Sequence, residues 1–158
     1  MSKARPAEPD DAAELVRLRM IMLAAVSGQE PQPGPWQQRT EATLRTRLDR
    51  ENGSFVAYVV DDPGDSGRLA ACAVGLVEYR LGGPHNPSGE VGYVMNVSTD
   101  PGHRRRGYSR ACMTALLDWY RRRGIAVVDL RASVEGEPLY RSLGFVRTAD
   151  PAMRLTLH

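Results

Sequence analysis

One stretch, Gly92 to Leu117, constrains the fold more than any other part of the chain, because it has the pattern of a strand, a loop and a helix start. The apolar run Tyr93 to Val97 is followed by turn-forming residues and then by four basic residues at 103–106. Beyond them, apolar residues recur at the three- and four-residue spacing of an amphipathic helix. We therefore expect a buried strand that leads through a basic loop into a buried helix.

The start of this helix is suited to binding a phosphate group. The amides of a first helical turn lack partners inside the helix and lie at the positive end of its macrodipole. Gly107 has no Cβ that would keep a bulky anion away, and the arginines at 104–106 add guanidinium groups that match phosphate oxygens. The Gly-Lys-Ser/Thr of a P-loop and the GxGxxG of a dinucleotide-binding fold are both absent from this loop.

Two motifs resemble those of the GCN5-related N-acetyltransferase (GNAT) superfamily. The run Arg104-Arg105-Arg106-Gly107-Tyr108-Ser109 resembles that family's Arg/Gln-x-x-Gly-x-Gly/Ala loop, which binds the pyrophosphate of acetyl-CoA. Ser109 departs from this pattern, because the family has glycine or alanine at this position. Serine is small enough to fit, but it adds a hydroxyl. About thirty residues on, Tyr140-Arg141-Ser142-Leu143-Gly144-Phe145 resembles the family's Tyr-x-x-x-Gly-Phe element, whose tyrosine lies beside the coenzyme sulfur. The resemblance covers the chain well from about Ser54 onward and only loosely before it.

This resemblance implies an α+β (mixed α/β) fold with a mostly antiparallel sheet of about seven strands, one splayed parallel pair and about four flanking helices. The residue patterns agree with a single domain over residues 1–158. Strands are expected at 3–8, 55–60, 68–79, 93–97, 126–132, 145–148 and 153–157, and helices at about 11–27, 36–50, 108–123 and 135–143.

The resemblance also implies a coenzyme site. The backbone of residues 95–99 would bind the pantetheine arm where a bulge at Asn96-Val97 opens the sheet, although a plain buried strand is the alternative. The residues expected to bind acetyl-CoA are Val97, Ser98, Thr99, Arg104, Arg105, Arg106, Gly107, Tyr108, Ser109, Arg110 and Ser133.

Acetyl transfer to an amine sets three chemical demands. At pH 7 a lysine-like amine is almost wholly protonated, and freeing the attacking base costs about 4.6 kcal/mol. A carboxylate should therefore accept the proton, and Glu78 and Glu90 are the candidates, with solvated strand-end carboxylates as the alternative. The Val97 amide is the candidate oxyanion donor. Tyr140 is the candidate acid or hydrogen-bond donor to the leaving thiolate, and its alternative role is a packed core tyrosine.

Composition limits the partners and the compartment. A net charge of +2 is too small to imply a polyanionic partner, so we expect no nucleic acid. The only cysteines, Cys72 and Cys112, offer no disulfide framework and no metal site, which suits a reducing compartment. The polar N-terminus lacks a secretory core, and no apolar run approaches the roughly twenty residues of a membrane span. These features predict a cytoplasmic enzyme without metal or membrane contact.

The predicted function is an acetyl-CoA-dependent N-acetyltransferase that uses acetyl-CoA as co-substrate and transfers the acetyl group to a primary amine by direct attack in a ternary complex. One alternative is a catalytically inactive acyl-CoA sensor or interaction module with the same fold. Another is that the three arginines contact nucleic acid, although no aromatic ladder accompanies them. The acceptor stays open between a small-molecule amine and a peptide or protein amine. A homodimer is also considered, because dimers are common among proteins that this chain resembles.

Overall fold

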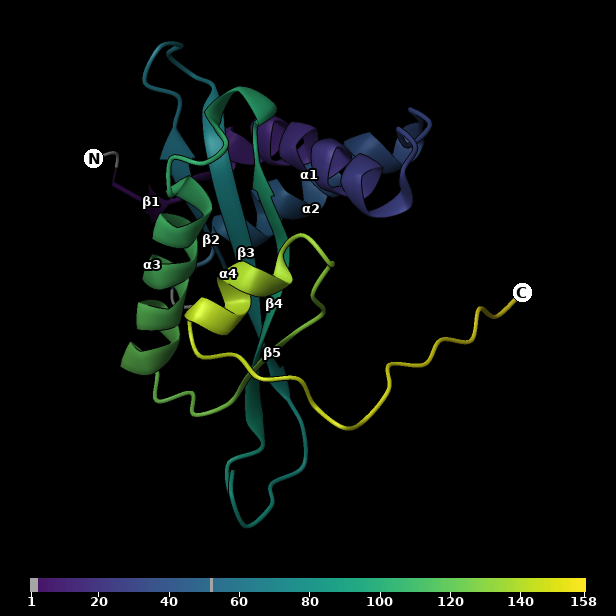
Figure 1. Cartoon of the computed structure of the whole chain (residues 1–158), viewed down its shortest axis with the longest axis vertical. Coiled ribbons are helices and arrows are strands. Elements are labelled where there is room, and N and C mark those ends of the chain that lie inside the picture. The colour runs from purple at the N-terminus through teal and green to yellow at the C-terminus, as the bar shows by residue number, and fades with distance from the viewer. Residues whose placement is uncertain (1–2, 52) are drawn as a thin grey trace.

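The protein, a computed structural model that describes residues 3–51 and 53–158, is built on one mixed sheet with helices on both faces (Figure 1). Five strands lie in the order β1-β2-β3-β4-β5. The strands are β1 (Arg5–Pro6), β2 (Phe55–Asp61), β3 (Leu69–Tyr79), β4 (Glu90–Thr99) and β5 (Val128–Leu130). The helices are α1 (Ala12–Ser27), α2 (Pro35–Leu48), α3 (Tyr108–Arg122) and α4 (Glu137–Ser142), with short 3-10 turns η1 (Pro9–Asp11) and η2 (Pro101–His103). The predicted mixed α+β class is confirmed.

Each face of the sheet has its own hydrophobic core, as the alternation of a strand requires. On β2, Tyr58 and Val60 pack with α3 and α4, whereas Ala57 and Val59 pack with α1 and α2. The pairs β1-β2, β2-β3 and β3-β4 are antiparallel. Among the described strands only β4 and β5 pair in parallel, and α3 is the crossover between them. No helix of the described residues is long and apolar enough to cross a membrane.

Helix α3 lies close against the sheet because two strand glycines leave room for Tyr120. A Cβ built on Gly92 would lie 2.7 Å from the Tyr120 ring, and one on Gly75 would lie as close to Leu116. The fully buried Tyr120 hydroxyl lies within hydrogen-bond distance of the carbonyl oxygens of Leu76 (3.0 Å) and Tyr93 (3.1 Å). This tyrosine therefore fixes α3 to the middle of both β3 and β4.

Strand β4 carries the bulge that the family resemblance implies. Val74 pairs with Met95 and Cys72 with Ser98, so that two residues of β4, Asn96 and Val97, lie opposite one residue of β3. Asn96 has a φ of 53°, an uncommon value for a residue other than glycine. The parallel pairing of β4 with β5 ends at Val94 and Leu130, so the two strands separate beyond this point. The splayed parallel pair is confirmed.

The sheet has five strands instead of about seven, because the last two predicted strands do not form. Residues 145–148 and 153–157 have extended or irregular backbone without ladder partners, and β5 is shorter than the predicted 126–132. Met153, Leu155 and Leu157 alternate as in a strand, but the segment runs away from the sheet and is exposed (Figure 1). Alternation shows that one face favours burial, and it does not show which sheet edge supplies the partner.

Candidate active site

Two residues of the loop between β4 and α3 have left-handed backbone conformations. Arg105 has a φ of 64° and Gly107 a φ of 76°, and Gly107 is the N-cap residue of α3. Left-handed residues next to ordinary ones turn successive amides to the same side and form anion-binding concavities. A Cβ built on Gly107 would meet no atom within 4 Å, so the space in front of this helix start is open.

Positive charge at the start of α3 is not neutralised by the helix itself. Gly107 provides no capping side chain, and the first turn contains no acidic residue. Arg104, Arg105 and Arg106 are exposed around this turn. The hydroxyl of Ser109 is hydrogen-bonded to that of Thr99 at the end of β4. The site therefore has the electrostatics of an anion-binding helix start.

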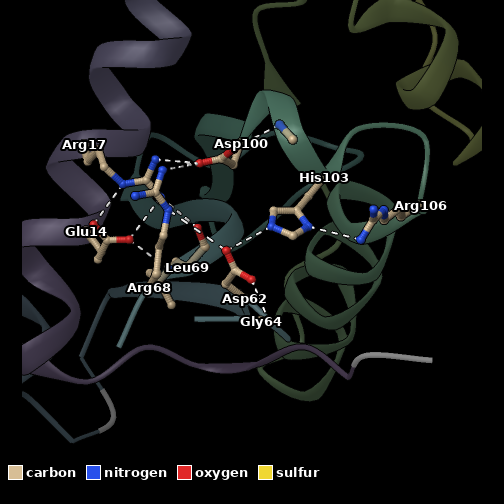
Figure 2. Close-up of polar contacts among 10 residues, drawn as sticks. Glu14, Arg17, Asp62, Gly64, Arg68, Leu69, Asp100, His103 and Arg106 are labelled. Atoms are coloured by element: carbon tan, nitrogen blue, oxygen red, sulfur yellow. Dashed lines mark hydrogen bonds and ion pairs between the residues drawn. The ribbon is translucent and has the colours of Figure 1, made fainter. Parts of the chain in front are cut away.

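A network of partly buried ion pairs fastens this loop to α1 and to the turn before β3 (Figure 2). Asp100 accepts hydrogen bonds from the Gly102 amide (3.0 Å), Arg17 (2.7 Å) and Arg68 (3.1 Å). Arg17 also donates to Glu14 at 2.8 Å. Burial by itself would raise the pKa of Asp100, but the bonds from Gly102 and the two arginines outweigh it and lower this pKa to about 2.

A second chain of contacts reaches one of the loop arginines (Figure 2). His103 Nε2 lies 2.9 Å from Asp62, and His103 Nδ1 lies 3.3 Å from an Nη of Arg106. A guanidinium can only donate, so the contact with Arg106 and the contact with Asp62 fit a ring that accepts at Nδ1 and donates at Nε2. Asp62 also accepts from the Gly64 amide, and these bonds lower its pKa. The His103 imidazole therefore links Arg106 to the β2–β3 turn.

Replacing Asp100 by Asn should destabilise the fold by about 1–3 kcal/mol, because Arg17 and Arg68 lose their shared carboxylate. In the native protein the depressed pKa of about 2 means that this contribution is complete above about pH 4 and is lost as the pH falls toward 2. Urea unfolding at several pH values measures both effects. Asp118→Asn, which removes an exposed helix pair with Arg121, is the control and should change stability by under about 0.5 kcal/mol. Equal losses for the two variants would contradict this account.

Tyr140 lies on α4, where its ring packs edge-on against Phe145 at a centroid distance of 6.0 Å. The residue is 9% exposed, and burial raises the pKa of its phenol. It lines a cavity of about 280 Å³ together with β5 and residues 145–148. Arg110 at the start of α3 donates to Ser142 on α4 at 2.8 Å. The fold thus joins the helix that begins at the basic loop to the helix that carries the tyrosine.

The two candidate bases are not brought to the bulge. Glu78 and Glu90 pair with Val91 and Tyr79 at the end of the β3–β4 ladder opposite the basic loop. Val97 follows Glu90 by seven residues in β4, which is about 23 Å at roughly 3.3 Å per residue. Glu78 is moreover bound by Arg80 at 2.7 Å. Both carboxylates therefore lie far from the bulge along the ladder, and their role as the base stays a prediction.

Ser133 has a local role in the fold. Its hydroxyl accepts from the Gly136 amide at 3.1 Å, and its carbonyl accepts from the Glu137 amide at 3.0 Å. These bonds order the exposed turn between β5 and α4.

Val97 is partly buried against the α3 core, whereas Ser98 is 6% exposed and its hydroxyl has no hydrogen-bond partner among the described residues. The coenzyme-facing roles of these residues stay predictions.

Sequence reasoning missed the residues that hold the loop in place. Arg17 and Asp100 are 83 positions apart, and Asp62 and His103 are 41 apart. The only local signal is Asp100 before Pro101, which fits a capped turn.

Groups of three or more His, Cys, Asp or Glu side chains placed to hold a metal ion are absent from the described residues.

Comparison with known sequences identifies the family. The sequence model described as the Acetyltransferase (GNAT) family matches residues 22–145. The chain belongs to this GNAT family. A search of proteins with curated functions gave no significant match.

Solved GNAT structures share the fold over nearly the whole chain. A predicted acetyltransferase from Clostridium acetobutylicum, crystallised with acetyl-CoA, is 24% identical with a TM-score of 0.83 and covers 99% of this chain and 96% of its own. A GCN5-related N-acetyltransferase from Ralstonia eutropha is 26% identical with a TM-score of 0.77 and covers 98% of this chain and 99% of its own. Glucosamine-6-phosphate N-acetyltransferase from Arabidopsis thaliana is 17% identical, with a TM-score of 0.76 and 98% coverage of both chains. The chain therefore shares the fold of these GNAT structures over nearly its whole length.

Proposed function

We propose that this GNAT protein is an acetyl-CoA-dependent N-acetyltransferase that transfers the acetyl group to a primary amine by direct attack in a ternary complex. One observation carries the proposal: the free edge of β4 beyond Val94 leads to the basic start of α3, which Arg110 joins to the helix of Tyr140. The family supports acetyl transfer in general, and the Clostridium structure contains acetyl-CoA. We treat residues 1–158 as one domain.

The proposed binding mode uses backbone before side chains. The amides of residues 104–109 would bind the diphosphate, with Arg104, Arg105 and Arg106 neutralising its charge. The pantetheine arm would lie along 97–99 like a short extra strand, because β4 has no strand partner there on the β5 side. The Ser133 hydroxyl is used within its own turn, so its proposed role is to order this turn beside the coenzyme.

The proposed chemistry assigns three tasks. An amide at the bulge, that of Val97, would stabilise the oxyanion. Tyr140 would donate a hydrogen bond to the leaving sulfur. Full proton transfer to a thiolate of pKa near 8.5 is uphill from a phenol near 10, and burial raises the pKa of Tyr140 further. Tyr140 is therefore proposed to stabilise the thiolate without giving up its proton.

The acceptor amine is proposed to enter between α1 and the basic loop. A cavity of about 730 Å³ lies there, lined by apolar residues of α1, by Arg104 and by two carboxylates, Glu30 and Glu135. Carboxylates at a cavity wall attract an ammonium group and can hold a water that accepts its proton. Glu78 and Glu90 stay candidates only for a longer relay. The neighbours include enzymes named for aminoglycosides and glucosamine 6-phosphate, and small amines of that kind are the first acceptors to test.

Two assays in sequence test the function. Calorimetry with acetyl-CoA should show one-to-one binding, and mixing with a panel of primary amines should release coenzyme A thiol. Binding without thiol release from any amine would favour the sensor alternative. Binding of single-stranded nucleic acid with no binding of acetyl-CoA would favour the third class.

Gly107→Ala should weaken acetyl-CoA binding at least 10-fold, which is about 1.4 kcal/mol, because the added methyl group occupies the open space before the helix start. Gly28→Ala is a matched control, since Gly28 also has a φ of 76° and an equally open surrounding. Both variants should lose about 1 kcal/mol of stability from left-handed strain. Calorimetric titration of the two variants would contradict the binding mode if their affinities for acetyl-CoA were equal.

A further inference from the structure

One partly buried arginine of α1 has no counter-ion. Arg19 forms no ion pair with a carboxylate of the described residues, whereas Arg17 on the same helix pairs with Glu14 and Asp100. An arginine side chain stays charged and carries several N–H donors in a planar fork. Within the described part of the chain, the one acceptor for these donors is the Asn96 side chain, at 3.3 Å. The guanidinium therefore has donors left for an incoming anion.

The Asn96 side chain holds this guanidinium at the bulge of β4. Asn96 is one of the two bulge residues, and its Nδ2 lies 3.8 Å from Cys72 Sγ, which leaves Oδ1 to accept from Arg19. Leu15 and Val16, about one turn before Arg19 on α1, are buried in the core between this helix and the sheet. Side chains three and four positions apart share one face of a helix. A charged group therefore stands where an apolar residue would continue the core.

This position is on the side of the sheet that the proposed mechanism leaves to the acceptor. Met95 of β4 packs in the core with α1 and α2, whereas Tyr140 belongs to the core on the opposite face. The proposed mechanism puts Tyr140 at the leaving sulfur, so the amine approaches from the face of α1. Val16 and Met20, close to Arg19 on that helix, line the cavity proposed for the acceptor. An acceptor in this cavity thus has both Arg19 and the bulge beside it.

We propose that Arg19 is a specificity-determining residue and that the acceptor is an apolar α-amino acid, whose carboxylate Arg19 binds; this inference rests on the proposed function. A guanidinium fork matches a carboxylate with two parallel hydrogen bonds. In an α-amino acid the amine and the carboxylate share one carbon, so a carboxylate at Arg19 brings the amine to the adjoining bulge. Met20 and Ile21 in the cavity wall suit an apolar side chain. Glu30 and Glu135, both exposed, are left to attract the ammonium group.

Pairs of amines that differ in the carboxylate test this preference. Thiol release is measured with L-leucine, L-valine and L-phenylalanine, with the decarboxylated amine of each, and with the amide of each, which represents a peptide amine. The native protein should prefer the amino acids over their decarboxylated amines by about 10-fold or more in kcat/KM. In Arg19→Gln both ratios, to the amine and to the amide, should fall by about 10-fold or more. Because the same amines are used with both proteins, their different basicities cancel.

Two further variants serve as controls. Arg39→Gln makes the same change at an exposed arginine of α2 and should leave both ratios as they are in the native protein. Arg19→Lys keeps the charge but loses the planar fork, so its ratios should lie between those of the native protein and Arg19→Gln. All these variants should bind acetyl-CoA with native affinity in calorimetry, because Arg19 acts on the acceptor and not on the coenzyme.

The outcomes separate this inference from the proposed function. If Arg19 only supports the bulge, Arg19→Gln slows the reaction of all amines together and leaves the ratios unchanged, which would overturn the inference. A native protein that acetylates amines without a carboxylate equally well, or exclusively, would overturn it without any variant. Binding of acetyl-CoA with no thiol release from any amine would contradict the proposed function itself, and the inference with it.

Discussion

Tyr140→Phe is expected to lower kcat about 100-fold while the Kd for acetyl-CoA changes less than about 2-fold. The variant keeps the ring that packs on Phe145 and removes only the phenol oxygen. In the proposed mechanism that oxygen acts on negative charge that develops on the sulfur during the reaction. Its loss therefore raises the transition state more than it weakens binding.

Steady-state thiol release and calorimetry on the same preparation measure the two quantities. Tyr79→Phe is the control, because Tyr79 is 69% exposed at the far end of β3, and it should leave both values unchanged. An unchanged kcat for Tyr140→Phe would remove the phenol from the mechanism. A parallel loss of acetyl-CoA affinity would give Tyr140 a role in binding instead.

Tyr120→Ala is expected to destabilise the protein by about 3–5 kcal/mol. The substitution empties the space between α3 and the strand glycines, and it removes the hydroxyl that serves the carbonyls of Leu76 and Tyr93. A second variant, Tyr120→Phe, separates the hydroxyl from the ring. It keeps the packing of the ring and should cost only about 1–3 kcal/mol, because the two carbonyl groups lose their hydrogen-bond donor.

Urea unfolding of both variants measures these costs. Tyr79→Ala, at an exposed position, is the control and should lie within about 0.5 kcal/mol of the native protein. If Tyr120→Ala and Tyr79→Ala had similar stabilities, Tyr120 would not be the residue that fixes α3 to the sheet.

The features that the sequence predicted are those with local causes. The strand, basic loop and helix between Gly92 and Leu117 follow from residues that are neighbours in the chain, and the structure has them as β4, η2 and α3. The bulge at Asn96-Val97 and the splayed pair were implied by the family resemblance and are confirmed. Tyr140 was predicted to lie beside the coenzyme sulfur, and its role stays a prediction.

The features that were missed depend on contacts between distant segments. Arg17 and Asp100 meet only because α1 crosses the end of β4, and no periodicity in either segment shows this. Glu78 and Glu90 lie near strands of the site, and only the register shows that they stand at the end of the ladder away from the bulge. Their role as the base stays a prediction. The alternation of residues 153–157 predicted a strand, but the structure has no strand there, because alternation does not supply a partner edge.

The central claim is that the start of α3 binds the coenzyme diphosphate and directs the thioester along the open edge of β4 toward Tyr140. A crystal structure of the protein with acetyl-CoA measures this directly. We expect the diphosphate at the amides of residues 104–109 and the sulfur within about 4 Å of the Tyr140 hydroxyl. A diphosphate bound elsewhere, or a sulfur on the far side of the sheet from Tyr140, would contradict the account.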